Sequence, residues 1–168
     1  KYKVNILKKK INKINKKVKV KTYRVKAEDK NLGKILKQYD VIVDGTDNFK
    51  AKFLLNKFSL KYKKKLIIGA ISKFEGHIFT FDFSLKKSPC LKCFYQGEPA
   101  EGVLDCETDG ILGSTAVITG SLQANEVLKA ILNVGKNLNS HILIIDLLNL
   151  KFRKVLFRKR KGCICENI

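Results

Sequence analysis

Residues 39–48 have the sequence YDVIVDGTDN, in which a short apolar run ends at Asp44 and a glycine. Such a run, bounded by turn residues, is typical of a buried strand in a parallel sheet. Either Thr46 or Asp47 can cap the helix that is expected to follow, which continues to about Tyr62. A buried strand followed directly by a helix indicates an α/β fold with a mostly parallel sheet.

Outward from this stretch, hydrophobic periodicity predicts the remaining elements. Periodicity is lost between residues 84 and 110, which we interpret as a long functional loop. We find no internal repeat and no linker, and we therefore expect a single domain over residues 1–168. The expected helices cover residues 3–17, 31–38 and 111–134, and the expected strands cover residues 18–23, 66–68, 77–83, 141–145 and 152–157.

The composition narrows the class of protein. Apolar residues make up 45% of the chain, and no run approaches the roughly eighteen residues needed to span a bilayer. We expect a soluble protein of the cytoplasm, or alternatively of an organelle stroma or matrix. The net charge of +20 would suit nucleic-acid binding, but 31 of the basic residues are lysines and only 4 are arginines. Recognition of bases and bidentate contacts with phosphates favour arginine over lysine, so we expect no nucleic acid as partner. We also expect no membrane as partner. The sequence contains no methionine, and we expect residues before Lys1 in the complete protein.

Four cysteines form two close pairs, Cys90 with Cys93 and Cys163 with Cys165. Two thiolates three positions apart can bind one Zn²⁺ in a tight turn, and a second pair would complete a tetrahedral structural site. In a reducing compartment such pairs indicate a metal more than disulfides. The alternative is two separate pairs of ordinary thiols.

Two further residues are candidates for chemistry. Asp47 follows a parallel strand, where ligands bind in α/β sheets, and its carboxylate could hold Mg²⁺ against a triphosphate. The alternative for Asp47 is a helix cap. Cys106 stands between two acids in the long loop, and is either a nucleophile or an incidental thiol whose pKa the acids raise. His77 and His141 lie on apolar strands and are interpreted as structural.

One face of the helix expected at 111–134 carries small residues. Gly113, Ala116, Gly120 and Ala124 recur along it at helical spacing. This face predicts close packing of another backbone. We expect a homodimer built partly on it, and the alternative is packing of the same face against the chain's own sheet.

These motifs together resemble the ThiF/MoeB/HesA family, whose fold is shared with ubiquitin-activating enzymes. The resemblance covers nearly the whole chain. Its most specific parts are Thr46-Asp47-Asn48 at a strand end and GSLQANEVLK at residues 120–129. The other matching segments are KYKV at 1–4, IN at 14–15, YDVIVDGTDN at 39–48, LLN at 54–56, GAI at 69–71, EGH at 75–77, PCLKC at 89–93, and Cys106 with Gly110. The family implies a Rossmann-like sheet with a crossover loop and a C-terminal zinc-bound segment.

The resemblance implies ATP-dependent adenylation of the C-terminal glycine of a ubiquitin-like sulfur-carrier protein, ThiS- or MoaD-like, for thiamine or molybdopterin biosynthesis. It implies that Asp47 coordinates Mg²⁺ and organises the triphosphate, and that Lys3 lies against the phosphates of ATP. Cys106 matches a loop cysteine that accepts the acyl group or sulfur in some members. A sulfurtransferase is a further expected partner. Members of the family commonly form dimers, so the resemblance also implies a homodimer. The alternative is a non-catalytic protein of the same fold that binds a carrier or a sister subunit.

Three departures from the family pattern bear on these expectations. The family's glycine-rich phosphate loop does not precede Lys3 here, so we expect the N-terminal glycine-rich part to be missing and this chain alone to be inactive. Lys52 stands where many members have arginine. The closing pair, Cys163 and Cys165, is one residue shorter than the usual spacing.

Overall fold

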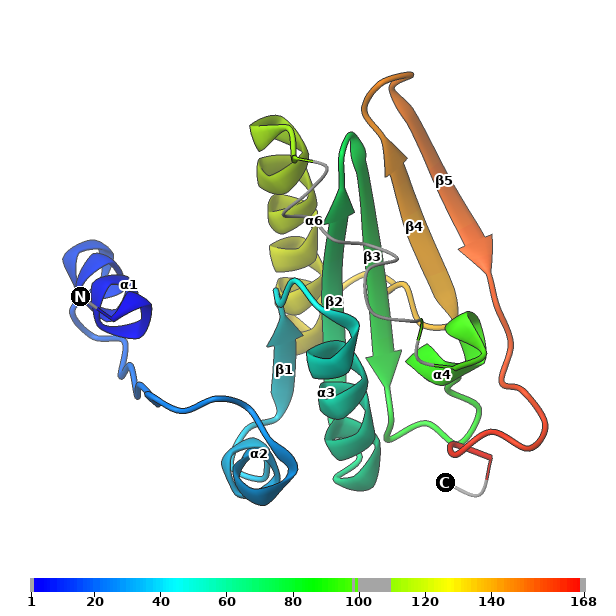
Figure 1. Ribbon diagram of the computed structural model, residues 1–168, viewed down its shortest axis with the longest axis horizontal. Coiled ribbons are helices and arrows are strands. Elements are labelled where there is room, and N and C mark those ends of the chain that lie inside the picture. The colour runs from blue at the N-terminus through cyan, green and yellow to red at the C-terminus, as the bar shows by residue number, and fades with distance from the viewer. Residues whose placement is uncertain (1, 98, 100–109, 167–168) are drawn as a thin grey trace.

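A five-stranded sheet with the strand order β1-β2-β3-β4-β5 forms the centre of the computed structural model (Figure 1). The structure describes residues 2–97, 99 and 110–166, so Cys106 lies outside the described residues. The strands are β1 (Val41–Asp44), β2 (Lys65–Ser72), β3 (Glu75–Asp82), β4 (His141–Asp146) and β5 (Lys151–Leu156). The helices are α1 (Lys3–Ile14), α2 (Asp29–Leu36), α3 (Phe49–Lys61), α4 (Leu91–Tyr95) and α6 (Gly113–Leu132).

The strand directions differ from the expectation of a mostly parallel sheet. Among the described strands, only β1 and β2 pair in parallel, joined through α3, whereas the β2–β3, β3–β4 and β4–β5 pairs are antiparallel. The connections explain two of these three antiparallel pairs, because β2 and β3 are separated by two residues and β4 and β5 by four. Connections of that length can form only hairpins, since a parallel crossover needs a dozen residues or more. The α/β class is confirmed.

Helices cover both faces of the sheet, and successive side chains of β3 point alternately to one face and to the other. Phe79 and Phe81 point into a core shared with α2, α3 and α4, where their rings contact one another and Phe79 contacts Phe94. Ile78 and Thr80 point to the opposite face, against α6. The end of the parallel β1–β2 pair therefore lies between α3 and α6 (Figure 1).

Helix α6 packs on the sheet with a polar stripe. The side chains that it buries are Thr115, Thr119, Gln123, Glu126 and Ala130. Large apolar side chains of the same helix are exposed, among them Val117, Leu128 and Ile131. The small residues at 113, 116, 120 and 124 are also exposed, so packing of that face against the chain's own sheet is excluded.

The N-terminal part departs most from the sequence-based expectations. Residues 18–23 form no strand, because their alternating lysines are exposed and no described strand lies beside them. Helix α1 buries none of its residues and stands apart from the sheet (Figure 1). Within the described residues, no helix combines the length and apolar character needed to cross a membrane.

Candidate functional site

The loop after β1 presents Asp47 at the carboxyl end of the parallel strand pair. Helix α3 begins at Phe49, and Asn48 is its cap, since the Asn48 side chain accepts a hydrogen bond of 2.8 Å from the Ala51 amide. The expectation that Thr46 or Asp47 caps this helix is wrong, because the helix starts one residue too late for Asp47 and two residues too late for Thr46. The Asp47 carboxylate instead accepts a hydrogen bond of 3.1 Å from Asn48 Nδ2 and is exposed.

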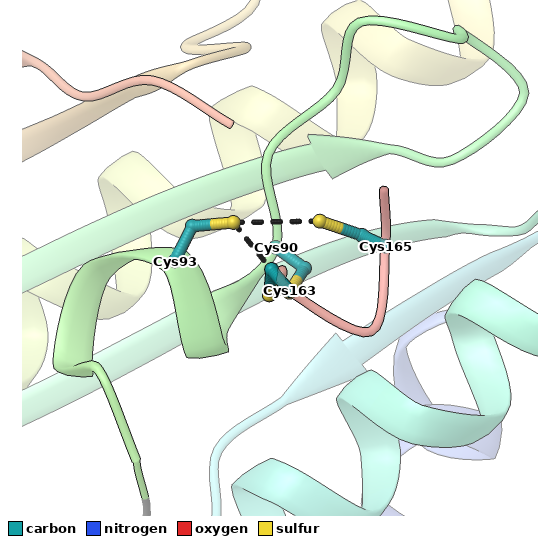
Figure 2. Close-up of side chains that lie close together, drawn as sticks. All are labelled: Cys90, Cys93, Cys163 and Cys165. Carbon is teal, nitrogen blue, oxygen red and sulfur yellow. Dashed lines mark hydrogen bonds between the residues drawn. The ribbon is translucent and has the colours of Figure 1, made fainter. Parts of the chain in front are cut away.

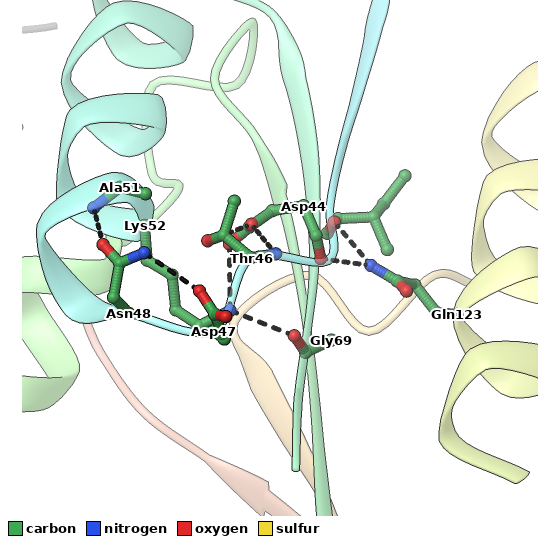
Figure 3. A network of polar contacts seen from close by, with 9 residues as sticks. Asp44, Thr46, Asp47, Asn48, Ala51, Lys52, Gly69 and Gln123 are labelled. Carbon is green, nitrogen blue, oxygen red and sulfur yellow. Dashed lines mark hydrogen bonds and ion pairs between the residues drawn. The ribbon is translucent and has the colours of Figure 1, made fainter. Parts of the chain in front are cut away.

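A buried network beneath this loop fixes its shape (Figure 3). Asp44 is 1% exposed, and its Oδ1 accepts hydrogen bonds from the amide and the hydroxyl of Thr46, at 2.8 and 2.7 Å. Its Oδ2 lies 3.2 Å from the ammonium of Lys52, which also donates to the carbonyl of Gly69 on β2 at 3.1 Å. Asp44 thus ties the loop both to α3 and to the neighbouring strand.

Gln123 closes the same network from the opposite side (Figure 3). Its amide nitrogen donates to the carbonyls of Asp44 at 2.7 Å and Ile67 at 3.1 Å, which bridges β1 and β2 to α6. The side chain lies flat against Gly69, where an added Cβ would be 2.8 Å from Gln123 Oε1. A larger residue at position 69 would displace the Gln123 side chain, which holds the β1–β2 edge to α6.

A cavity of about 220 Å³ opens above this network, between the loop, β2 and α6. The hydrogen bond from Asn48 lowers the pKa of Asp47 below its ordinary value, and the positive charges of Lys3 and Lys52 lower it further. The charge of Lys3 thus acts on Asp47, and the expected place of Lys3 against the phosphates of ATP stays a prediction. The residues that line the cavity are Gly45, Thr46, Asp47, Asn48, Phe49, Lys52, Gly69, Ala70, Ile71, Ile111, Ala116, Thr119, Gly120 and Gln123.

The four paired cysteines meet at a second place, between α4 and the C-terminal turn (Figure 2). All four are buried, and their sulfur atoms lie within 4.8 Å of one another. Cys90 Sγ is 3.6 Å from Cys163 Sγ, and Cys93 Sγ is 3.4 Å from Cys165 Sγ. A tetrahedral Zn²⁺ with Zn–S bonds of about 2.3 Å separates its sulfur atoms by about 3.8 Å, so the donor set fits zinc. Burial raises the pKa of the Cys90 thiol to about 12. A cation bound among the four thiols would lower that pKa and favour the thiolate.

The two histidines lie away from both places. Burial lowers the pKa of His77, whose Nε2 is 3.8 Å from a carboxylate oxygen of Glu75. His141 Nδ1 is 2.9 Å from the carbonyl of Asn139. Neither histidine lines the cavity that contains Asp47.

A profile of the ThiF family matches residues 1–166. The chain belongs to the ThiF family. It is 33% identical over 162 residues to a sulfur carrier protein adenylyltransferase of Thermus thermophilus, covering 94% of this chain and 60% of that protein. It is 34% identical over 154 residues to a probable molybdopterin-synthase adenylyltransferase of Gracilaria tenuistipitata var. liui, covering 92% and 43%. The chain thus spans roughly half the length of these ThiF relatives.

The fold of this ThiF-family chain is also found among solved structures. The crystal structure of E. coli MccB with ATP superposes with a TM-score of 0.82 at 17% identity, covering 100% of this chain and 52% of MccB. The complex of MccB with N-formylated MccA gives a TM-score of 0.83 at 15% identity, covering 99% and 52%. The expected Rossmann-like fold is confirmed.

Sequence reasoning identified part of this ThiF-family site. Asp47 was a candidate from its place after a strand, the four cysteines from their spacing, and Lys3 from the family resemblance alone. The Asp44–Lys52 pair and Gln123 were not given roles. Gln123 belongs to the GSLQ motif that carried the resemblance, which was the available signal. Asp44 was recognised only as the residue that ends a strand.

Replacing Lys52 by Met should lower the free energy of unfolding by about 3–5 kcal/mol, because Asp44 would be left as an uncompensated buried charge. Guanidinium unfolding followed by circular dichroism measures this change. The double variant Asp44→Asn, Lys52→Met should recover much of the loss, since the side-chain oxygen of the introduced asparagine can still accept the bonds from Thr46. A loss below about 1 kcal/mol in the single variant would contradict the role of the pair.

Proposed function

We propose that the protein containing this chain adenylates the C-terminal glycine of a ubiquitin-like sulfur-carrier protein, ThiS- or MoaD-like, for thiamine or molybdopterin biosynthesis. The observation that carries the proposal is the Asp47 carboxylate, which is ionised, is not used as a helix cap, and borders a cavity at the carboxyl end of a parallel strand pair. Membership of the ThiF family and the names of the relatives support it. Residues 1–168 would form a single adenylation domain.

In the proposed reaction, a carboxylate oxygen of the carrier's last glycine attacks the α-phosphorus of ATP. The bond from that phosphorus to the pyrophosphate oxygen breaks, which leaves an acyl-adenylate and pyrophosphate. Mg²⁺, when bound, would neutralise charge on the phosphate oxygens. Asp47 fits this ion, since Mg²⁺ is commonly held by one or two carboxylates together with phosphate oxygens. Lys3 adds positive charge near the same carboxylate.

Three further assignments belong to the proposal. The four clustered cysteines hold a structural Zn²⁺, with no part in the chemical step. Cys106 is an acyl or sulfur acceptor, or else a sulfurtransferase delivers the sulfur. We place the protein in the cytoplasm or in an organelle stroma or matrix, where thiols stay reduced.

ATP–pyrophosphate exchange on the full-length protein tests the proposed function. With Mg²⁺ and a carrier ending in Gly-Gly, label from pyrophosphate should enter ATP. Omitting the carrier, or deleting its last glycine, should abolish the exchange. A protein that binds the carrier without any exchange would contradict the proposal and favour the non-catalytic alternative.

We also propose a homodimer through the outer face of α6, built partly on the exposed small residues at 113, 116, 120 and 124. The exposed side chains of this helix include no charged residue, in a chain that is 30% charged and carries a net charge of +20. Val117 is 68% exposed, Leu128 55% and Ile131 58%. A second copy is the favoured occupant, because two uncharged faces can meet without bringing like charges into contact.

Light scattering at tens of micromolar should give the mass of a dimer. Replacing Leu128 by Lys should give a monomer, since it would place like charges in the proposed interface. Leu148→Lys is the control, because Leu148 is 69% exposed in the β4–β5 turn and should leave the dimer intact. A monomer mass for the unmodified protein would contradict the proposal.

A further inference from the structure

Helix α4 lies between the cysteine cluster and helix α3. Cys90 is its N-cap and Cys93 lies within it, so α4 carries two of the four clustered thiols (Figure 2). A helix of five residues is too short to be stable by itself and depends on tertiary contacts. Asn56 of α3 supplies one of them, because its side-chain oxygen accepts a hydrogen bond of 3.0 Å from the Leu91 amide. The N-terminal end of α4 is therefore held against α3.

The last residue of α4 also packs against α3, through an aromatic ring. The Tyr95 ring centroid lies 5.1 Å from that of Phe49, with an interplanar angle of 74°, and 6.3 Å from that of Phe53. Edge-to-face contacts of this kind fix the relative orientation of two rings and add to the gain from burial. Tyr95 is not among the residues that line the cavity containing Asp47.

Phe49, in contrast, is part of that cavity. It is the first residue of α3, directly after the cap Asn48, and it lines the cavity together with Asp47. Helix formation does not account for an aromatic residue at this position, since phenylalanine is neither a cap nor a strong helix former. Tyr95 thus contacts a residue of the cavity wall without being part of the wall itself.

We propose that Tyr95 is a positioning residue for the adenylation site, because it holds the Phe49 ring at the wall of the cavity. This inference rests on the proposed function. Tyr95 does not touch the reacting groups, and it acts through Phe49 on the space that Mg-ATP would occupy beside Asp47. Since α4 also carries Cys90 and Cys93, the same contact couples the cysteine cluster to the cavity. A metal held by the cysteines would restrain α4, and α4 in turn restrains Phe49.

The alternative is that Tyr95 only fills the core, and its neighbour on α4 provides the comparison. Among the described residues, the ring of Phe94 contacts Phe79, Tyr95 and Phe157, and it does not line the cavity. Substitution of either α4 residue removes aromatic surface from the same cluster. Only Tyr95 of the two contacts Phe49, so the pair separates positioning from stability.

Calorimetric titration of the full-length protein with Mg-ATP measures the effect on binding. Tyr95→Leu should raise the Kd for Mg-ATP by about three- to tenfold, the range expected for the loss of one aromatic pair. Tyr95→Phe keeps the ring, and Phe94→Leu leaves the Phe49 contact, so both should stay within about twofold of the unmodified protein. Phe94→Leu should nevertheless lower the melting temperature about as much as Tyr95→Leu does. In the exchange assay, Tyr95→Leu should raise the KM for Mg-ATP by the same factor and leave kcat nearly unchanged.

A second comparison tests whether Tyr95 acts through Phe49. Phe49→Leu should also weaken Mg-ATP binding, and adding Tyr95→Leu to it should cause no further loss, because the contact is already gone. Removal of the metal by a chelator, followed by dialysis into Mg²⁺ buffer, should weaken Mg-ATP binding in the unmodified protein more than in Phe49→Leu. Equal weakening in these two proteins, or none in either, would overturn the coupling to the cysteine cluster.

The outcomes that would overturn the positioning role are distinct from those that concern the proposed function. An unchanged Kd in Tyr95→Leu would overturn it, as would an equal loss in Phe94→Leu or additive losses in the double variant. Should Tyr95→Leu fail to fold, an unchanged Kd in Phe49→Leu would overturn it alone. Absence of exchange in the unmodified protein, with Mg-ATP still bound, would overturn only the proposed function. Absence of Mg-ATP binding would overturn both.

Discussion

Replacing Asp47 by Asn should lower the rate of carrier-dependent ATP–pyrophosphate exchange by about 100- to 1,000-fold, a loss typical of removing one charge-stabilising group from an active site. Asparagine keeps the size of the side chain but removes the negative charge that Mg²⁺ needs. The free energy of unfolding should change by no more than about 0.5 kcal/mol, because Asn48 and not Asp47 caps α3. Exchange assays and guanidinium unfolding on the same preparations measure the two quantities.

Asn48→Ala is the matched variant for stability. It removes the side chain that accepts from the Ala51 amide, so it should cost about 1 kcal/mol of unfolding free energy. Asp47→Asn therefore tests metal binding with the cap intact, whereas Asn48→Ala tests the cap and also removes the hydrogen bond from Asn48 Nδ2 to Asp47. Near-normal exchange by Asp47→Asn would show that Asp47 is not the metal ligand.

The pH dependence of the exchange should follow from the same carboxylate. The hydrogen bond from Asn48, with the charges of Lys3 and Lys52, holds the pKa of Asp47 below its ordinary value. A group whose pKa is lowered in the folded state stays ionised until the pH falls through that lowered value. Protonation of Asp47 should therefore not limit exchange at neutral or mildly acidic pH.

The sequence predicted those parts of the fold that depend on local patterns. The apolar run before Asp44 and the capping residues after it placed one strand and one helix nearly correctly. The directions of the β2–β3 and β4–β5 pairs were mispredicted, because they depend on the two- and four-residue connections rather than on the pattern of the strands. The orientation of α6 was left open, since its small residues fit either an interface or a packed face.

The candidate site divides in the same way. Asp47 and the cysteine pairs carry short motifs, so spacing alone was enough to suggest chemistry. The bonds of Gln123 to the carbonyls of Asp44 and Ile67 join residues 79 and 56 positions apart. No local pattern encodes such contacts, because they exist only after the sheet and α6 have packed. The cap was misassigned by one residue, which is within the usual uncertainty of a helix boundary.

The cysteines are the buried residues of the C-terminal segment, and Lys159 and Arg160 add hydrogen bonds to the carbonyl of Lys86 and to Cys93 Sγ. Of residues 158–166, only Cys163 and Cys165 are buried, and Ile164 is 50% exposed. The four sulfur atoms are already grouped at distances close to those around a tetrahedral zinc. We therefore expect the metal to contribute most of the attachment of this segment to α4.

Metal analysis of the purified protein should find about one zinc per chain. Cys93→Ser, or removal of the metal by a strong chelator, should lower the melting temperature by roughly 10–20 °C. This follows from a loss of about 4–5 kcal/mol in the free energy of unfolding for a chain of this size, well below the roughly 10–16 kcal/mol of zinc binding in small peptides.

Cys106→Ser is the matched control, and it should keep both the zinc content and the melting temperature. Because the loss arises from attachment and not from chemistry, proteolysis of the metal-depleted protein should begin within residues 158–166. The opposite result is a protein that is purified without zinc and whose melting temperature is unchanged by the chelator and by Cys93→Ser. This result would show that packing alone holds the four thiols.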